Sequence, residues 1–294
     1  MNLNNIDNPI GLLGNLKFLK IRKCPELYTI PIPSLKLASL EKLSLSYLPI
    51  KSLSPILDES LDKLRILNVK YCPELETIPT LKLASLEKLS LSGFLIESLS
   101  PMLDESLNKL KILNVKYCPE LQTIPPLKMN SLENLRISCC DSLDSLTPML
   151  DGSLDKLKTL SIDDCASLKN IPPLKLPSLE TLDLLNLPSI ESFSPILDES
   201  LGKLKCLYIK DCHKLTSFPS VMLPSLEILD LTRCLFLEKF LPMVNGSMAK
   251  LKILKLEGCK KLKNIPAINL DSLYEFNHSG CESLEFPPPT NGRD

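Results

Sequence analysis

Cysteine is the first residue type of this sequence to consider for chemistry, because eleven are present and a thiolate can attack an electrophile, ligate a metal or pair in a disulfide. Nine of the eleven occupy one fixed place in a recurring pattern; they are Cys24, Cys72, Cys118, Cys140, Cys165, Cys212, Cys234, Cys259 and Cys281. A nucleophilic cysteine needs a partnered base, and no such base is near. Stacked strands would place consecutive cysteines about 5 Å apart, within disulfide reach, so a reducing compartment would be needed to keep them free.

The histidines and the acidic segments add no convincing site. His213 beside Cys212 and His278 before Cys281 lack the paired CxxC or CxxH spacing of a closed zinc site. The repeated DES segments within residues 54–61, 100–107 and 194–201 fit helix starts, where carboxylates are stabilised by the helix dipole. We therefore expect a protein that is not an enzyme and that has no catalytic residue, metal site or cofactor.

The element that positions these residues is a leucine repeat, LxxLxLxxC followed by xxL and often xxIP, which recurs every 22 to 25 residues. A period in this range indicates a solenoid. The LxL portion alternates apolar and polar residues, as does a strand with one buried face, so successive repeats should stack as a parallel sheet. The repeats begin at Leu16, Leu40, Leu64, Leu86, Leu110, Leu132, Leu157, Leu179, Leu204, Leu226, Leu251 and Leu273, which we call the origin leucines.

Two kinds of repeat alternate, so the full period is about 47 residues. Odd repeats end in a proline-containing segment, such as residues 78–85 and 171–178, and proline favours extended backbone. Even repeats continue in SPILDESL or SPMLDESL, with Pro at a first helical position, which favours a short helical turn. We predict an α/β solenoid of about twelve repeats, with short parallel strands on its concave face and alternating extended and short-helical segments on its convex face.

The predicted boundaries are a flank or partial preceding repeat at residues 1–15, a repeat array at 16–287 and a disordered tail at 288–294. The net charge is −1, so no general attraction for nucleic acid or an anionic membrane is expected. No apolar run reaches the roughly 20 residues that span a bilayer, and the first residues lack a basic stretch and a cleavage site of the secretory type. The sequence is therefore typical of the cytoplasm or the nucleus.

The repeat text resembles a known family. Leu-x-x-Leu-x-Leu with a following Cys and a terminal IP or FP is similar to leucine-rich repeats, and residues 157–184 and 251–273 resemble the repeat region of plant intracellular disease-resistance receptors. That resemblance implies a horseshoe that recognises a pathogen effector, a guarded host protein or the receptor's own nucleotide-binding module. No GxxxxGK[ST] phosphate loop occurs, so the family's nucleotide switch is not in this chain.

The candidate recognition surface consists of polar and aromatic residues that flank the inward leucines of each strand and should face outward. It is basic with interleaved aromatics near the N-terminus, acidic in the centre, and mixed beyond. We predict a protein partner for it, with no nucleic acid and no membrane; a solvated sheet without a partner is the alternative. The candidates are Phe18, Lys20, Arg22, Lys42, Tyr47, Lys70, Tyr71, Lys88, Lys116, Tyr117, Arg136, Asp163, Asp164, Asp183, Tyr208, Lys210, Asp230 and Arg233.

Two other functional interpretations remain open. Similar solenoids follow an F-box in substrate receptors of ubiquitin ligases, which would require about 40 helical residues before the first repeat. The near-verbatim repeats and the weak capping at both ends are also compatible with a decayed gene duplicate that has no role of its own.

Overall fold

The computed structural model describes residues 13–28, 37–54, 57, 61–75, 79–100, 103, 107–150, 154–169, 171–193, 197, 199–242, 247–265 and 273–285. The predicted tail at 288–294 and all but the last three residues of the predicted flank at 1–15 lie outside these ranges. The chain divides into two compact parts, residues 1–160 and 161–294, which we call the N-terminal part and the C-terminal part. The border falls within strand β7 (Thr159–Asp163).

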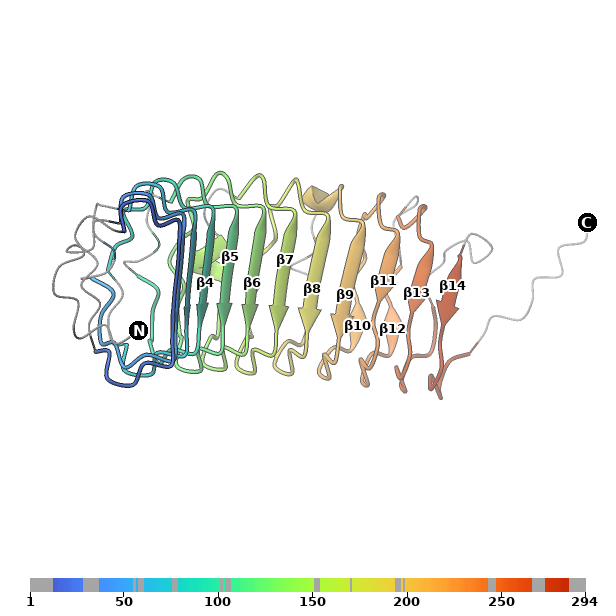
Figure 1. The fold of residues 1–294 in the computed structure, drawn as a ribbon. Helices are drawn as coiled ribbons and strands as arrows, with labels where there is room; N and C mark the ends of the chain where they lie inside the picture. Colours follow the sequence, from blue (N-terminus) through green and yellow to red (C-terminus); the bar gives the residue numbers. More distant parts are fainter. Residues whose placement is uncertain are drawn as a thin grey trace, which may run out of the picture. The chain divides into compact units, whose positions relative to one another are not determined.

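Each part carries a parallel sheet whose strands pair in chain order without a shift in register (Figure 1). Every one of these strands begins two residues after an origin leucine, so the predicted leucine-rich solenoid is confirmed. In the N-terminal part the strands are β1 (Phe18–Arg22), β2 (Lys42–Ser46), β3 (Ile66–Lys70), β4 (Lys88–Ser92), β5 (Ile112–Lys116) and β6 (Asn134–Ser138). In the C-terminal part they are β8 (Thr181–Leu185), β9 (Cys206–Lys210), β11 (Ile228–Asp230), β13 (Ile253–Lys255) and β14 (Glu275–Asn277).

The core lies behind the strands and consists of stacked leucines. The second and fourth residues of a strand point inward, and Leu43, Leu67 and Val69 are fully buried. The origin leucines from Leu40 to Leu226 are buried as well. Each fully buried aliphatic side chain contributes about 1.5–3 kcal/mol, and most of its contacts come from neighbouring repeats because one repeat cannot enclose its own apolar face.

Behind the sheet, the two kinds of repeat differ as predicted. In even repeats the amides of Leu57, Leu103, Leu150 and Leu197 each donate to the carbonyl four residues earlier, which makes one helical turn. One such turn is α2 (Thr147–Leu150), and a 3-10 turn, η2 (Glu199–Leu201), follows in a later even repeat. Residues 79–83 and 171–176 of odd repeats have no helix, in agreement with their prolines. Parts of the predicted helix starts at 54–61, 100–107 and 194–201 lie outside the described residues.

A second line of strand pairing on the back of the repeats was not predicted. In the C-terminal part β10 (Ser217–Phe218) pairs in parallel with β12 (Lys239–Phe240), and the buried rings of Phe218 and Phe240 pack with centroids 5.2 Å apart. In the N-terminal part Ser98 and Thr123 form an equivalent single bridge. These pairs join the back of an odd repeat to that of an even one by backbone hydrogen bonds, such as those from the amides of Gln122 to Glu97 and of Glu238 to Thr216.

An alternation of charge just before the strands was also missed by the sequence analysis. The residue after each origin leucine, from Lys17 to Lys252, is a cation in odd repeats and Glu in even repeats; we call these residues the pre-strand row. Five neighbouring pairs in this row form ion pairs at 2.8–3.1 Å. The best aligned is Arg65 with Glu87, whose two hydrogen bonds of 2.9 and 3.1 Å raise the pKa of Arg65 and lower that of Glu87. The pre-strand row therefore favours contact between an odd repeat and an even one.

Candidate functional site

The outward face of the sheet in the N-terminal part contains no acidic residue. The first, third and fifth residues of each strand point outward, and we call these residues of β1 to β6 the strand face. Seven of them are cations, and the rest are small polar, amide or apolar residues; the cations are Lys20, Arg22, Lys42, Lys70, Lys88, Lys116 and Arg136. All seven had been predicted to point outward.

These seven cations lack acidic partners among the described residues. No ion pair there involves any of them, although ion pairs are frequent elsewhere in the molecule. In the C-terminal part, by contrast, the outward Lys210 pairs with Asp230 at 2.7 Å and Lys255 with Glu275 at 3.0 Å. Within β1 to β6 the strand register sets each of these cations beside a neutral residue, and no carboxylate on the same face offsets their combined positive potential. The strand face of the N-terminal part is therefore electrostatically suited to an anionic ligand.

A row of left-handed residues follows the strands. Each strand of the N-terminal part is followed directly by a residue with φ between 51° and 75°, and we call these six residues the exit row: Lys23, Tyr47, Tyr71, Gly93, Tyr117 and Cys139. This conformation turns the chain so that the next residue enters the core, as Cys72 and Cys118 do with no exposed surface. The amides continue the ladder, because Tyr47 donates to the Lys70 carbonyl at 3.0 Å and Tyr71 to that of Ser92 at 2.7 Å.

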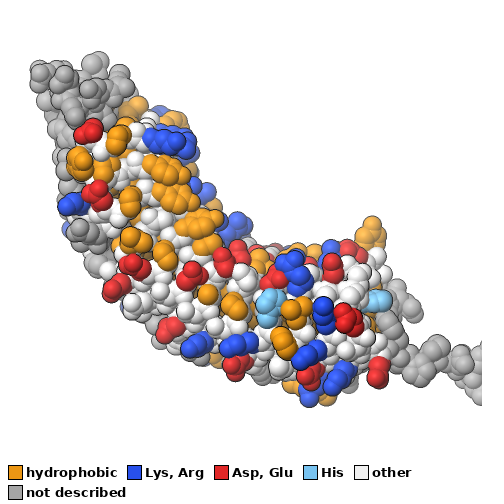
Figure 2. Space-filling view, turned by 90° about the horizontal axis from the view of Figure 1, so that it is seen from below, with side chains coloured by type: hydrophobic (Ala, Val, Ile, Leu, Met, Phe, Trp, Pro, Cys, Tyr) orange, Lys and Arg blue, Asp and Glu red, His pale blue; other side chains and the backbone are white. Residues whose placement is uncertain are grey.

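Three tyrosines of the exit row form an exposed aromatic line. The rings of Tyr47 and Tyr71 stack with centroids 5.1 Å apart, and Tyr71 and Tyr117 lie 6.2 Å apart. Tyr71 reaches toward Tyr117 across Gly93, where a Cβ atom would lie 2.5 Å from the Tyr71 ring. The guanidinium of Arg22 covers the other side of Tyr47 at 5.5 Å. The rings are 37–49% exposed, and Figure 2 shows a line of hydrophobic side chains bordered by basic ones over the N-terminal part.

Two grooves run beside this aromatic line. The first, of about 400 Å³, has a floor of Ser44 and Ser46 on β2, between cations of β1 and β3. The second, of about 310 Å³, has a floor of Ser90 and Ser92 on β4, between cations of β3 and β5. Lys70 and Tyr71 line both, so they form the shared wall. The grooves follow from the two-repeat period, because small serines fall on even strands and longer side chains on odd ones.

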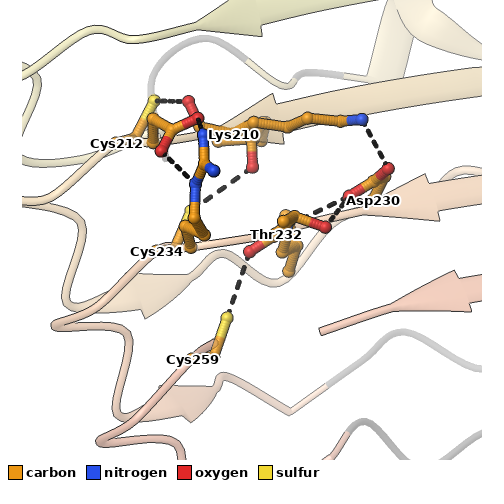
Figure 3. Close-up of polar contacts among 10 residues, drawn as sticks. Lys210, Cys212, Asp230, Thr232, Cys234 and Cys259 are labelled. Atoms are coloured by element: carbon orange, nitrogen blue, oxygen red, sulfur yellow. Dashed lines mark hydrogen bonds and ion pairs between the residues drawn. The ribbon is translucent and has the colours of Figure 1, made fainter. Parts of the chain in front are cut away.

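The candidates in the C-terminal part have a different environment. Arg233 makes two hydrogen bonds of 2.6 and 2.7 Å to Asp211, and Asp164 accepts one of 2.7 Å from Asn186. Asp230 corrects the prediction of an exposed side chain, since it is only 3% exposed. Figure 3 shows the cause: Lys210 pairs with its carboxylate, which also accepts bonds from the amide and hydroxyl of Thr232 at 3.1 and 2.6 Å.

The remaining C-terminal candidates are partly covered. Asp163, Asp183 and Tyr208 are half-buried on β7, β8 and β9, and burial raises the pKa of Tyr208. The ammonium of Lys210 lies 5.2 Å from the centre of the Tyr208 ring as well as beside Asp230. Acidic and basic side chains intermingle over this part in Figure 2. Several of the charges predicted for the acidic and mixed stretches are therefore already neutralised by neighbours in the C-terminal part.

None of the eleven cysteines, all of which lie in the described residues, forms a disulfide, and the nine repeated ones donate hydrogen bonds to backbone carbonyls. Cys259 donates to the Leu231 carbonyl at 3.0 Å and Cys281 to that of Leu256 at 3.0 Å. Burial raises the pKa of Cys212 and of Cys259 to about 12, so both thiols stay protonated at neutral pH. Among the described residues, no three His, Cys, Asp or Glu side chains gather in a way that could hold a metal ion.

Comparisons with known proteins give one informative match. No protein-family model matches, and neither does any curated protein. Among solved structures, a complex of TLR13 with ssRNA13 superposes with a TM-score of 0.59 at 18% identity, covering 91% of this chain and 44% of that one. The leucine-rich repeat domain of the type III effector XopL matches at 0.49 and 21% identity, covering 88% and 75%. An internalin of Listeria monocytogenes matches at 0.48 and 18%, covering 94% and 88%.

At these identities the comparisons concern the fold alone. No helix in the described ranges has the length and apolar character needed to cross a bilayer. The strands that follow each origin leucine, the inward leucines and the buried cysteines are the parts of a leucine-rich repeat. This chain therefore has the leucine-rich repeat fold.

Proposed function

We propose that this chain is a non-enzymatic recognition scaffold that binds an acidic protein partner on the strand face of its N-terminal part. The observation that carries the proposal is the set of seven outward cations without carboxylate partners in the described residues, next to three exposed tyrosines. Positive charge accelerates encounter with an acidic partner, and Tyr and Arg are frequent energetic hot spots of interfaces. The two grooves supply concave contact area at the same place.

We place this activity in plant immunity, as the sensing and autoinhibitory repeat region of an intracellular receptor that works in the cytoplasm or the nucleus. The repeat text that resembles such receptors supports this assignment. The partner would then be a pathogen effector, a guarded host protein or the receptor's own nucleotide-binding module. A substrate-receptor subunit of a ubiquitin ligase is the alternative, and sequencing the 5′ end of the transcript distinguishes the two by the module encoded upstream.

Charge reversal tests the proposal. Replacing Lys70, Lys116 and Arg136 with Glu should abolish capture of the partner from plant extract, because it changes the strand-face charge from +7 to +1. The matched control reverses three exposed lysines in the turns before strands, Lys63, Lys109 and Lys156, with the same change in net charge. Circular dichroism of both variants verifies folding. Capture that survives in the first variant, or is lost equally in the control, refutes the proposal.

RNA is the competing ligand for a basic surface with aromatic residues. The aromatic line argues against insertion of a base, which needs about 7 Å between two rings, twice the 3.4 Å rise per nucleotide. The centroids of Tyr47 and Tyr71 lie 5.1 Å apart and those of Tyr71 and Tyr117 lie 6.2 Å apart. The ssRNA in the TLR13 complex belongs to that protein. A gel shift with single-stranded RNA that weakens steeply with salt and disappears in the triple variant would favour RNA over an acidic protein.

A further inference from the structure

We infer that the strand face of the N-terminal part binds an acidic polyproline II segment whose carboxylates recur at every third residue. The inference rests on the proposed function and specifies the conformation and charge pattern of the partner. Three features of the described structure carry it: the spacing of one row of cations, the aromatic line beside that row, and the grooves between its members.

The cations of one row recur on every second strand. Strand register places Arg22, Ser46, Lys70, Ser92 and Lys116 side by side, one from each of β1 to β5. We call this line the cation row. Neighbouring strands lie about 4.8 Å apart, so successive cations of the row are about 9.6 Å apart, with a serine between them. The spacing is a property of the sheet, because every pair in the row is in register.

Among regular peptide conformations, polyproline II matches this spacing. It has three residues per turn and rises 3.1 Å per residue, so residues three apart are about 9.3 Å apart and project on the same side. A β-strand repeats a face every two residues, at about 6.6–6.8 Å, and an α-helix does so at about 5.4 Å for one turn or about 10.8 Å for two. Over the two steps of the cation row, polyproline II thus departs by about 0.6 Å, whereas two-turn spacing in an α-helix departs by about 2.4 Å. A segment with Asp or Glu at every third position could therefore present one carboxylate to Arg22, one to Lys70 and one to Lys116.

The aromatic line lies directly beside the cation row. Tyr71 and Tyr117 follow Lys70 and Lys116 in the chain, and Tyr47 follows Ser46. Proline-rich segments in this conformation dock against aromatic-lined grooves, since their rigid backbone loses little entropy on binding. Because the tyrosine rings already stack on one another and on Arg22, they are preorganised for such contact. The grooves over Ser46 and Ser92 lie between successive cations.

Two synthetic peptides of identical composition test the inference. The first is an acetylated (Glu-Pro-Pro)₄ peptide, whose carboxylates recur at every third residue; the second contains the same residues with the glutamates irregularly spaced. Binding to the full chain is measured by fluorescence polarisation at low and physiological salt. We expect the periodic peptide to bind at least tenfold more tightly. Equal affinities, or no binding of the periodic peptide, overturn the inference.

Two matched variants assign the binding to the cation row. Lys70→Ser introduces the residue that the same row already contains on β2 and β4, so the fold should tolerate it. Lys63→Ser removes an exposed cation from the turn before β3, outside the strand face and both grooves. Lys70→Ser should weaken binding of the periodic peptide at least fivefold, and Lys63→Ser should weaken it less than twofold. Equal losses in the two variants refute the row as the binding element.

The outcomes separate this inference from the function on which it rests. If both peptides bind equally and both lose affinity in the Lys70, Lys116 and Arg136 charge reversal, the acidic partner remains and the three-residue pattern fails. If that reversal leaves capture of the protein partner unchanged, the proposed function fails as well.

Discussion

Gly93 is the position at which a single methyl group tests the link between the exit row and the aromatic line. Its φ is +75°, and an added Cβ would lie 2.5 Å from the Tyr71 ring and 3.2 Å from the Tyr71 Cα. Gly258 is a matched control, since its φ is +73° but its nearest contact would be the Arg233 side chain at 3.4 Å. Alanine at either site incurs the left-handed backbone cost, whereas only Gly93→Ala must also displace an aromatic ring.

The expected magnitudes follow from these two contributions. A left-handed L-residue costs about 1–2 kcal/mol, of which about 0.4–1 kcal/mol is offset because alanine restricts the unfolded chain. We therefore expect Gly258→Ala to lower the free energy of unfolding by about 0–1.6 kcal/mol. Gly93→Ala should lose in addition the stacking of Tyr71 on Tyr47, about 0.5–1.5 kcal/mol for an aromatic pair, and should thus cost about 0.5–3 kcal/mol.

Urea unfolding followed by circular dichroism measures these values, and a double-mutant cycle isolates the clash. In a Tyr71→Ala background the ring is gone, so Gly93→Ala should cost only the backbone strain, and the coupling energy should be about 1 kcal/mol. Gly93→Ala should also weaken binding of the periodic peptide, because the displaced Tyr71 ring no longer lines the grooves. The reasoning is wrong if Gly93→Ala costs no more than Gly258→Ala, or if its cost is unchanged in the Tyr71→Ala background.

Three further predictions concern stability. Glu87→Lys places three cations in succession in the pre-strand row, so it should lower the unfolding midpoint at low salt, and 1 M salt should remove the difference from wild type. Burial raises the pKa of Cys212 and Cys259 from 9.0 to about 12, so these thiols ionise at lower pH in the unfolded chain than in the folded protein. Their contribution to the free energy of unfolding is therefore complete below pH 9 and is lost between pH 9 and 12. A Cys212→Ala/Cys259→Ala variant should show a flatter decline of the unfolding midpoint over that range. Phe218→Ala empties a fully buried site against another ring and should cost about 3–5 kcal/mol in urea unfolding; a loss below 1 kcal/mol would contradict the packing of the second strand line.

The fold could be predicted from the sequence because its main determinant is local. The alternation of Leu113 and Val115 with polar residues defines a strand, and its recurrence defines the stack. The proline-containing or helix-start segment after each strand likewise predicted whether the backbone behind the sheet is extended or forms a helical turn. The charge alternation of the pre-strand row is equally visible in the sequence, whereas the ion pairs it forms depend on the register of neighbouring strands.

The candidate surface was less predictable because exposure depends on neighbouring strands. Asp230 and Asp183 occupy the same position in their repeats, yet Asp230 is buried because Lys210 and Thr232 approach it from two sides. The tyrosines at 47, 71 and 117 were expected on the strands, but they lie one residue beyond, in the left-handed turn. The sequence shows that these tyrosines recur directly before a residue expected in the core, whereas the stacking of their rings is seen only in the structure. Whether any of these residues contacts a partner remains a prediction.

Because the charges of the pre-strand row alternate, the chain can gain repeats without disturbing that order only if they are added in pairs. A gene duplication that copies one repeat would place two cations or two glutamates in succession, and two like backs side by side, whereas copying a pair preserves both orders. Residues 64–79 and 110–125 are nearly identical and are 46 residues apart, as expected if pairs were the copied unit. Each inserted pair would also lengthen the cation row by one step of about 9.6 Å. Such a lineage could therefore change the length of its recognition surface in discrete increments while keeping the surface pattern unchanged.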